Sequence, residues 1–228
     1  MTCEQSGSPE WISAAIDLVG VLLATFVGAF LAFRYETRQR ARHEEEAQVR
    51  SGQRALFALV AQVSALENLD TQHLAVLRDD PGRELKLRVI GVGHQVPSCD
   101  VDSLTFLMQT DPQLLASLLD GQQTFDSLFY TIEQHNRFDL EFQDRLAAFE
   151  RSGNILPTQL TKDMLERVTG PNIVRSLSGL TEEIFHSYEQ ARRKIHSNFT
   201  QLREALSRRF PRAKFFTFDL VRSGKSQG

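Results

Sequence analysis

This chain has little cysteine, little tryptophan and no excess of basic charge. Two of its 228 residues are cysteine and one is tryptophan. Cys3 and Cys99 lie on opposite sides of the membrane in the topology predicted below, so they cannot pair within one chain, and the main domain is consistent with a reducing compartment. The formal net charge of -3 lacks the basic excess that a nucleic-acid-binding protein carries, so we expect no nucleic acid among its partners.

Catalytic signatures are also missing. The sequence contains no Cys-x-x-Cys pair, no protein-kinase motif set and no Gly-x-Ser-x-Gly motif in a strand-turn-helix context. Gly91-Val92-Gly93 has neither the spacing nor the following helix of a phosphate-binding loop. We therefore expect no catalytic residue and no cofactor, and we predict that the protein is not an enzyme.

The longest apolar run extends from Trp11 to Phe33 and contains one acid, Asp17, and no Lys or Arg. At 1.5 Å of rise per residue, a helix of this length crosses a hydrocarbon core of about 30 Å. The run therefore predicts a single transmembrane helix. A cleaved signal peptide is the alternative, but it would have a basic start and a shorter apolar run.

The flanks of this run predict an orientation. Trp11 marks one membrane interface, and Arg34, Tyr35 and Arg38 mark the other as interface anchors. The N-terminal tail has acidic residues and no basic residue, so the positive-inside rule places it outside and the large C-terminal region in the cytoplasm. We expect a location in the cell membrane, the bacterial inner membrane in particular, with the lipid bilayer as a partner.

Small residues recur at every fourth position of the run, and two polar residues share their face. This predicted association face consists of Ser13, Asp17, Gly20, Ala24, Gly28 and Ala32. Small residues let helix backbones approach closely, so the face predicts a homo-oligomer. Asp17 is either a protonatable, ion-attracting group on the oligomer axis or a hydrogen-bonding partner for a neighbouring helix.

Helical periodicity dominates the rest of the chain. A charged stalk leads into an apolar seam formed by Leu56, Leu59, Val63 and Leu66, which fits the a and d positions of a coiled coil. A second long helix is predicted from Asp111-Pro112 to Arg151, with Gly153 as its C-cap. A short helix over 158–168 ends before Gly170-Pro171, and a third long helix is terminated by Pro211.

Two short segments alternate with a period of two, which predicts strands at Glu84 to Ile90 and Lys214 to Leu220. The predicted fold is all-α: a single N-terminal transmembrane helix that continues into a long-helix, coiled-coil-like three-helix bundle with a small two-stranded distal sheet. The predicted segments are an extracytoplasmic tail (1–10), the transmembrane helix (11–33), a charged helical stalk (34–50), the cytoplasmic bundle (51–222) and a disordered tail (223–228).

Two pairs of an acid and a histidine stand four residues apart, His135 with Asp139 and Glu182 with His186. Such a pair holds a metal only when other ligands complete the set. With six histidines in a helical chain such pairs arise by chance, so we expect no metal site.

Three functions are compatible with these features. The preferred one is a non-enzymatic, single-pass membrane-anchored protein that self-associates and presents a cytoplasmic helical bundle to a protein partner. The alternative, suggested by an analogy of layout alone, is a membrane-perturbing or pore-forming effector of the bacterial antiviral or abortive-infection type. A metal-dependent enzyme is the third hypothesis and depends on the histidines.

Overall fold

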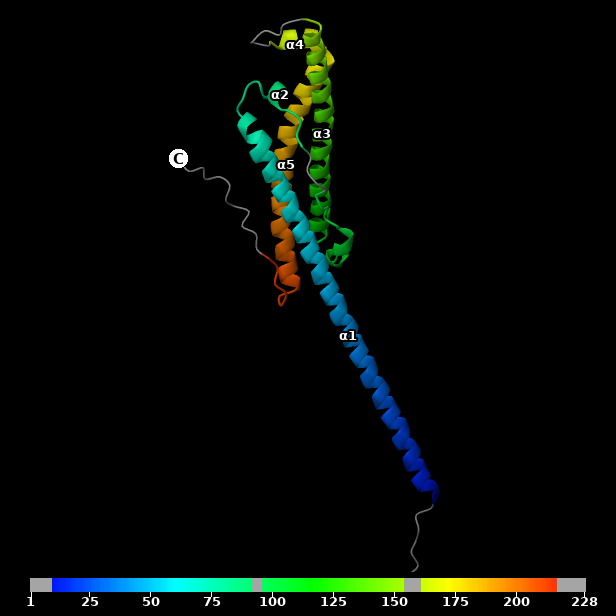
Figure 1. Ribbon diagram of the computed structural model, residues 1–228. Coiled ribbons are helices and arrows are strands. Elements are labelled where there is room, and N and C mark those ends of the chain that lie inside the picture. Colours follow the sequence, from blue (N-terminus) through cyan, green and yellow to red (C-terminus); the bar gives the residue numbers. More distant parts are fainter. Residues whose placement is uncertain (1–9, 92–95, 154–160, 217–228) are drawn as a thin grey trace, which may run out of the picture. The chain divides into compact units, whose positions relative to one another are not determined.

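The computed structural model describes residues 10–91, 96–153 and 161–216, and within the first range it leaves the side chains of 10–19, 21 and 24 undescribed. The chain divides into two compact units, Met1–Gln48 and Val49–Gly228. One helix, α1 (Glu10–Leu69), contributes to both units (Figure 1). The elements that follow it are also helical.

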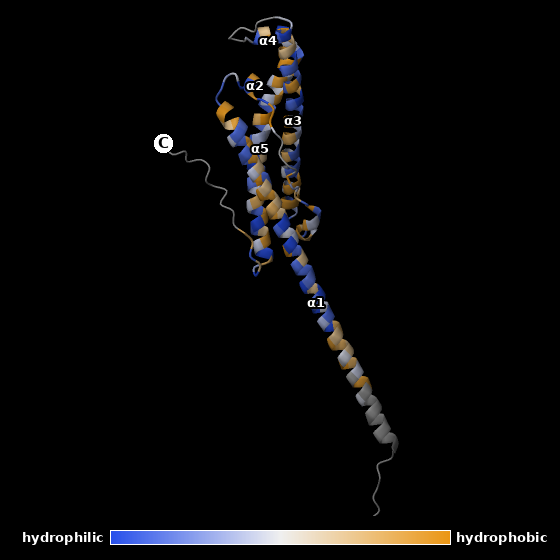
Figure 2. Ribbon diagram, in the orientation of Figure 1, coloured by the Kyte–Doolittle hydropathy of each residue, from blue (hydrophilic) through white to orange (hydrophobic). Residues whose placement is uncertain are grey.

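In the first unit, α1 carries apolar side chains that its own chain leaves uncovered. From Gly20 to Phe33, every side chain that the structure describes is exposed. Figure 2 colours much of this stretch orange, the colour of hydrophobic residues. Charged residues follow from Arg34 onward, with ion pairs such as that between Arg40 and Glu36 on the helix surface.

The predicted location in a membrane is contradicted. Over the residues that the structure describes, no helix is both long enough and apolar enough to cross a bilayer. This finding corrects the predicted location, whereas the lipid bilayer as a partner and the membrane-perturbing effector stay predictions.

The second unit is a helical bundle, as predicted. Helix α1 is extended here by a π-helical turn, η1 (Asp70–Leu74), and by a 3-10 turn, η2 (Ala75–Leu77). One-turn helix α2 (Arg83–Lys86) and 3-10 helix η3 (Asp102–Leu107) precede the long helix α3 (Pro112–Arg151). Short helix α4 (Lys162–Thr169) leads into the last long helix, α5 (Pro171–Arg209). Within the unit, α1, α3 and α5 lie side by side (Figure 1).

The main core of the bundle joins these three long helices. The predicted seam of α1 is buried throughout, and α5 buries apolar residues from Ile184 to Leu206. Helix α3 buries Leu115, Leu118, Phe125 and Ile132, whereas Leu140 is exposed. A smaller cluster joins α3, α4 and α5 and consists of Phe142, Leu165, Ile173, Val174 and Leu177.

The ends of the helices follow the chemistry of their terminal residues. Pro112 and Pro171 are the first residues of α3 and α5. At this position a backbone N–H has no partner within the helix, so proline, which lacks the N–H, costs no helical hydrogen bond. Gly153 and Gly170 have φ of +85° and +98°, a region that favours glycine. These residues confirm the predicted ends of the second long helix and the predicted break before Pro171. The start predicted at position 158 lies outside the described residues.

The first predicted strand is not a strand. Glu84 lies in α2, and residues 87–91 then form an extended strap along α3. Asn136 on α3 donates from Nδ2 to the Ile90 carbonyl (2.8 Å) and accepts the Ile90 N–H at Oδ1 (2.9 Å). The Val89 N–H donates to Asp139 (3.2 Å). Side chains of a helix therefore satisfy the backbone groups for which a second strand was expected.

The second predicted strand has no support either. Residues 214–216 have no regular structure, and residues 217–220, like the predicted tail 223–228, lie outside the described ranges. Phe216 contacts the Phe199 ring of α5 at 6.4 Å between centroids. Across residues 10–91, 96–153 and 161–216 the structure has no sheet.

Candidate functional site

An exposed apolar segment, residues 20–35 of α1, is the first candidate site. Its large side chains are all half or more exposed: Leu22, Leu23, Phe26, Val27, Phe30, Leu31, Phe33 and Tyr35. A Cβ built on Gly20 or Gly28 would meet nothing within 4 Å. Apolar surface of this extent is typical of interaction sites, because exposing apolar side chains to water costs free energy.

The predicted association face is placed only in part. Gly20, Gly28 and Ala32 are exposed on α1. The side chains of the other members, Ser13, Asp17 and Ala24, lie outside the described residues. The structure therefore does not test the predicted roles of Asp17.

The predicted membrane-interface anchors are described only in part. The side chain of Trp11 lies outside the description, and Tyr35 and Arg38 are exposed. Arg34 places its guanidinium carbon 5.5 Å from the centroid of the Phe30 ring. This cation–π contact attaches a charged residue to the edge of the exposed apolar segment.

A buried polar cluster lies where the strap meets α3. His135 is fully buried, and neither ring nitrogen has a hydrogen-bond partner among the described atoms. Burial lowers the pKa of His135, whereas the negative charge of Asp139 and, to a smaller extent, the neighbouring Asn136 side chain oppose that shift. Asp139 is itself buried and lies 3.6 Å from the Arg88 guanidinium of the strap. The cluster therefore holds a neutral imidazole beside a carboxylate that the strap helps to neutralise.

The two acid and histidine pairs do not complete a metal centre. Glu182 accepts two hydrogen bonds from Arg83, at 2.8 and 2.6 Å, and this pairing lowers the pKa of Glu182. His186 places Nε2 2.6 Å from the amide nitrogen of Gln190. In the part of the chain that the structure describes, no three His, Cys, Asp or Glu residues gather as metal ligands do.

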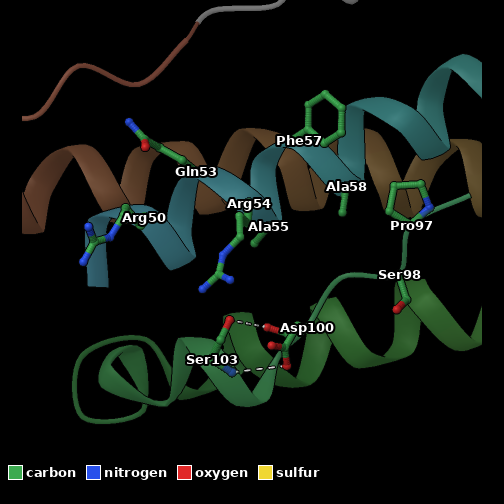
Figure 3. Close-up of a pocket in the computed structure, with 10 residues that line it drawn as sticks. All are labelled: Arg50, Gln53, Arg54, Ala55, Phe57, Ala58, Pro97, Ser98, Asp100 and Ser103. Atoms are coloured by element: carbon green, nitrogen blue, oxygen red, sulfur yellow. Dashed lines mark hydrogen bonds between the residues drawn. The ribbon is translucent and has the colours of Figure 1, made fainter. Parts of the chain in front are cut away.

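A groove between α1 and the segment before η3 was not found from the sequence. This arginine groove has a volume of about 660 Å³ and is lined by Arg50, Gln53, Arg54, Ala55, Phe57, Ala58, Pro97, Ser98, Asp100 and Ser103 (Figure 3). The spacing of Arg50, Arg54 and Phe57 on one helix face was a readable signal. The opposite wall, residues 97–103, has no pattern that would place it there.

Two glutamines, the buried Gln62 and the partly buried Gln122, hold that opposite wall, and no sequence pattern indicated their role. Gln62 on α1 donates from Nε2 to the Pro97 carbonyl (3.3 Å) and to Oε1 of Gln122 on α3 (2.7 Å). The same Oε1 accepts the Cys99 N–H (3.0 Å). Burial raises the pKa of the Cys99 thiol to about 11, so Cys99 is a packed side chain and not a nucleophile at neutral pH.

Comparison with known proteins leaves the geometry as the guide to function. No protein-family model, no curated protein and no solved structure matches this chain.

Proposed function

We propose that this protein is a non-enzymatic interaction module that self-associates through the exposed apolar segment, residues 20–35, and presents its helical bundle to a protein partner. One observation carries the proposal: seven large aliphatic or phenylalanine side chains between Leu22 and Phe33 are half or more exposed. A second copy of the same segment covers them with matching apolar surface. Copies of one chain associate most often as closed, symmetric oligomers.

The magnitude of the hydrophobic effect supports association. Full burial of one large apolar side chain contributes about 1.5–3 kcal/mol. Three or four such side chains per copy are therefore comparable with the roughly 8 kcal/mol of a micromolar complex. Gly20 and Gly28 leave open space beside the helix, so a neighbouring backbone can approach there.

Sedimentation velocity of the full chain tests this proposal. The wild type is expected to sediment as a multiple of its 25.9 kDa mass. The double variant Phe26→Glu/Phe30→Glu is expected to shift toward the single chain, because a carboxylate in an apolar interface loses its hydration. Phe57→Glu is the matched control, since Phe57 is equally exposed but lies in the bundle.

Two results would contradict the proposal. One is a wild-type chain that sediments as a monomer at every concentration. The other is a chain recovered only with membrane vesicles, because lipid and not a second copy would then cover the segment. Circular dichroism confirms that each variant keeps the helical fold.

A further inference from the structure

The arginine groove has the size and the walls of a ligand site. Its volume of about 660 Å³ falls within the roughly 300–1,000 Å³ typical of small-molecule sites. Ala55 and Ala58 are buried and point into the groove from α1 (Figure 3). Because their side chains are single methyl groups, they leave open the space that a larger residue would fill.

The opposite wall is formed before any ligand arrives. The amides of Gln62 and Gln122 fix the backbone at Pro97 and Cys99 through the hydrogen bonds given above. The Ser103 hydroxyl donates to the Asp100 carbonyl (2.8 Å) and closes the turn that follows (Figure 3). Because this wall is already ordered, it loses little conformational entropy when a ligand binds.

The charge of the groove is positive on its α1 wall. Neither Arg50 nor Arg54 forms an ion pair with a carboxylate of the described chain, and Arg54 donates only to the Ser51 hydroxyl (3.3 Å). The one carboxylate that lines the groove, Asp100, lies on the opposite wall and accepts the Ser103 N–H (3.4 Å). Two guanidinium groups four residues apart thus stand beside a mainly apolar surface.

We propose that the arginine groove binds a small amphipathic carboxylate. Its anionic end pairs with Arg50 and Arg54, because the planar guanidinium donates two parallel hydrogen bonds that match a carboxylate. Its apolar body covers Ala55 and Ala58, which point toward the opposite wall (Figure 3). The groove lies outside residues 20–35, so this proposal stands or falls independently of self-association.

Photocrosslinking of the full chain with octanoate that carries a diazirine at its apolar end tests the proposal. Mass spectrometry is expected to place the label on residues 54–58 or 97–103. Excess octanoate is expected to compete, whereas octanamide, which has the same body without the charge, is not. The double variant Arg50→Gln/Arg54→Gln is expected to lower labelling at least about ten-fold, since both charge-assisted pairs are lost.

Two further variants make the test specific. Arg192→Gln/Arg193→Gln removes the same charge from exposed positions of α5 and is expected to leave labelling unchanged. Ser98→Phe keeps both groove arginines but fills the groove from its exposed rim, and it is expected to lower labelling as strongly as the arginine variant. Circular dichroism melting shows that each variant is folded before it is labelled.

Three results would overturn the proposal: equal labelling of the wild type and Arg50→Gln/Arg54→Gln, equal competition by octanamide and octanoate, or a label confined to residues 20–35.

Discussion

At the scale of single residues, His135 links the stability of the bundle to pH. Its imidazole is fully buried without a hydrogen-bond partner, and burial lowers its pKa in the folded chain from the ordinary value of 6.5. Between the two pKa values the unfolded chain holds more protons than the folded chain. The free energy of unfolding should therefore fall as pH drops below about 6.5, by up to about 1.4 kcal/mol per pH unit for this one site.

The variant His135→Leu isolates this effect. It removes the buried base at a similar volume, so denaturant unfolding at pH 5 and pH 7.5 should give a smaller difference than in the wild type. Part of the acid-side loss should remain, because burial also lowers the pKa of His196, with the positive charge of Arg192 adding to the shift. The exposed His186→Leu is the matched control. An unaltered pH dependence in His135→Leu would refute this role.

Asn136 is the second residue whose role is specific. Its amide both donates to and accepts from the backbone of Ile90, which holds the strap on α3. Asn136→Ala leaves these two backbone groups without their partner, and we expect a loss of about 1–3 kcal/mol of stability. Urea unfolding measures the loss. Gln123→Ala, an exposed amide of the same helix, should change stability by less than about 0.5 kcal/mol; equal effects in the two variants would contradict the role of Asn136.

At the scale of elements, α3 and α5 are in close contact at Gly121. A Cβ on Gly121 would lie 2.3 Å from Nδ2 of Asn198. That amide donates to the Ser117 carbonyl (2.9 Å), and Asn198 Oδ1 accepts the Ser117 hydroxyl (2.7 Å). Gly121→Ala should displace this fully buried side chain and cost about 1–3 kcal/mol of stability.

Gly179 in α5 provides a matched control for that prediction. A Cβ there would meet nothing within 4 Å. Gly179→Ala should therefore stabilise the bundle by about 0.5–1 kcal/mol, because alanine loses less backbone entropy in a helix. Thermal melts of the two variants should move in opposite directions. A shift in the same direction would mean that the α3–α5 contact does not govern the cost at Gly121.

The long helices could be predicted from the sequence because their signals are local. Apolar residues at helical spacing marked the buried faces of α1 and α5, and Pro112 and Gly170 marked helix boundaries. The strap could not be predicted in the same way. Its period of two indicated an extended backbone, but the partner of that backbone is a side chain more than forty residues away, Asn136.

The candidate sites were predicted less well, for reasons that differ between them. The sequence identified the apolar run of α1, but it assigned a membrane where the described residues contain no helix able to span one. The α1 side of the arginine groove could have been predicted, because its residues recur at helical spacing on one face. Its other wall depends on hydrogen bonds from Gln62 and Gln122, and long-range contacts of two glutamines leave no periodic signal.

At the scale of the whole molecule, the chain combines a packed bundle with an unpacked apolar helix. The bundle satisfies its apolar faces within Val49–Gly228, with clusters that reach from Ala55 to Phe210. The segment 20–35 has no such partner among the described residues. We assign that missing partner to further copies of the same segment.

Hydroxyl-radical footprinting of the full chain at rising protein concentration tests this assignment most directly. Phe57 is exposed in the bundle and should react at every concentration, whereas the buried Phe125 should stay protected. We predict that Phe26 and Phe30 react like Phe57 in dilute samples and become protected like Phe125 as the chains associate. Equal reactivity of Phe26, Phe30 and Phe57 at every concentration would contradict it.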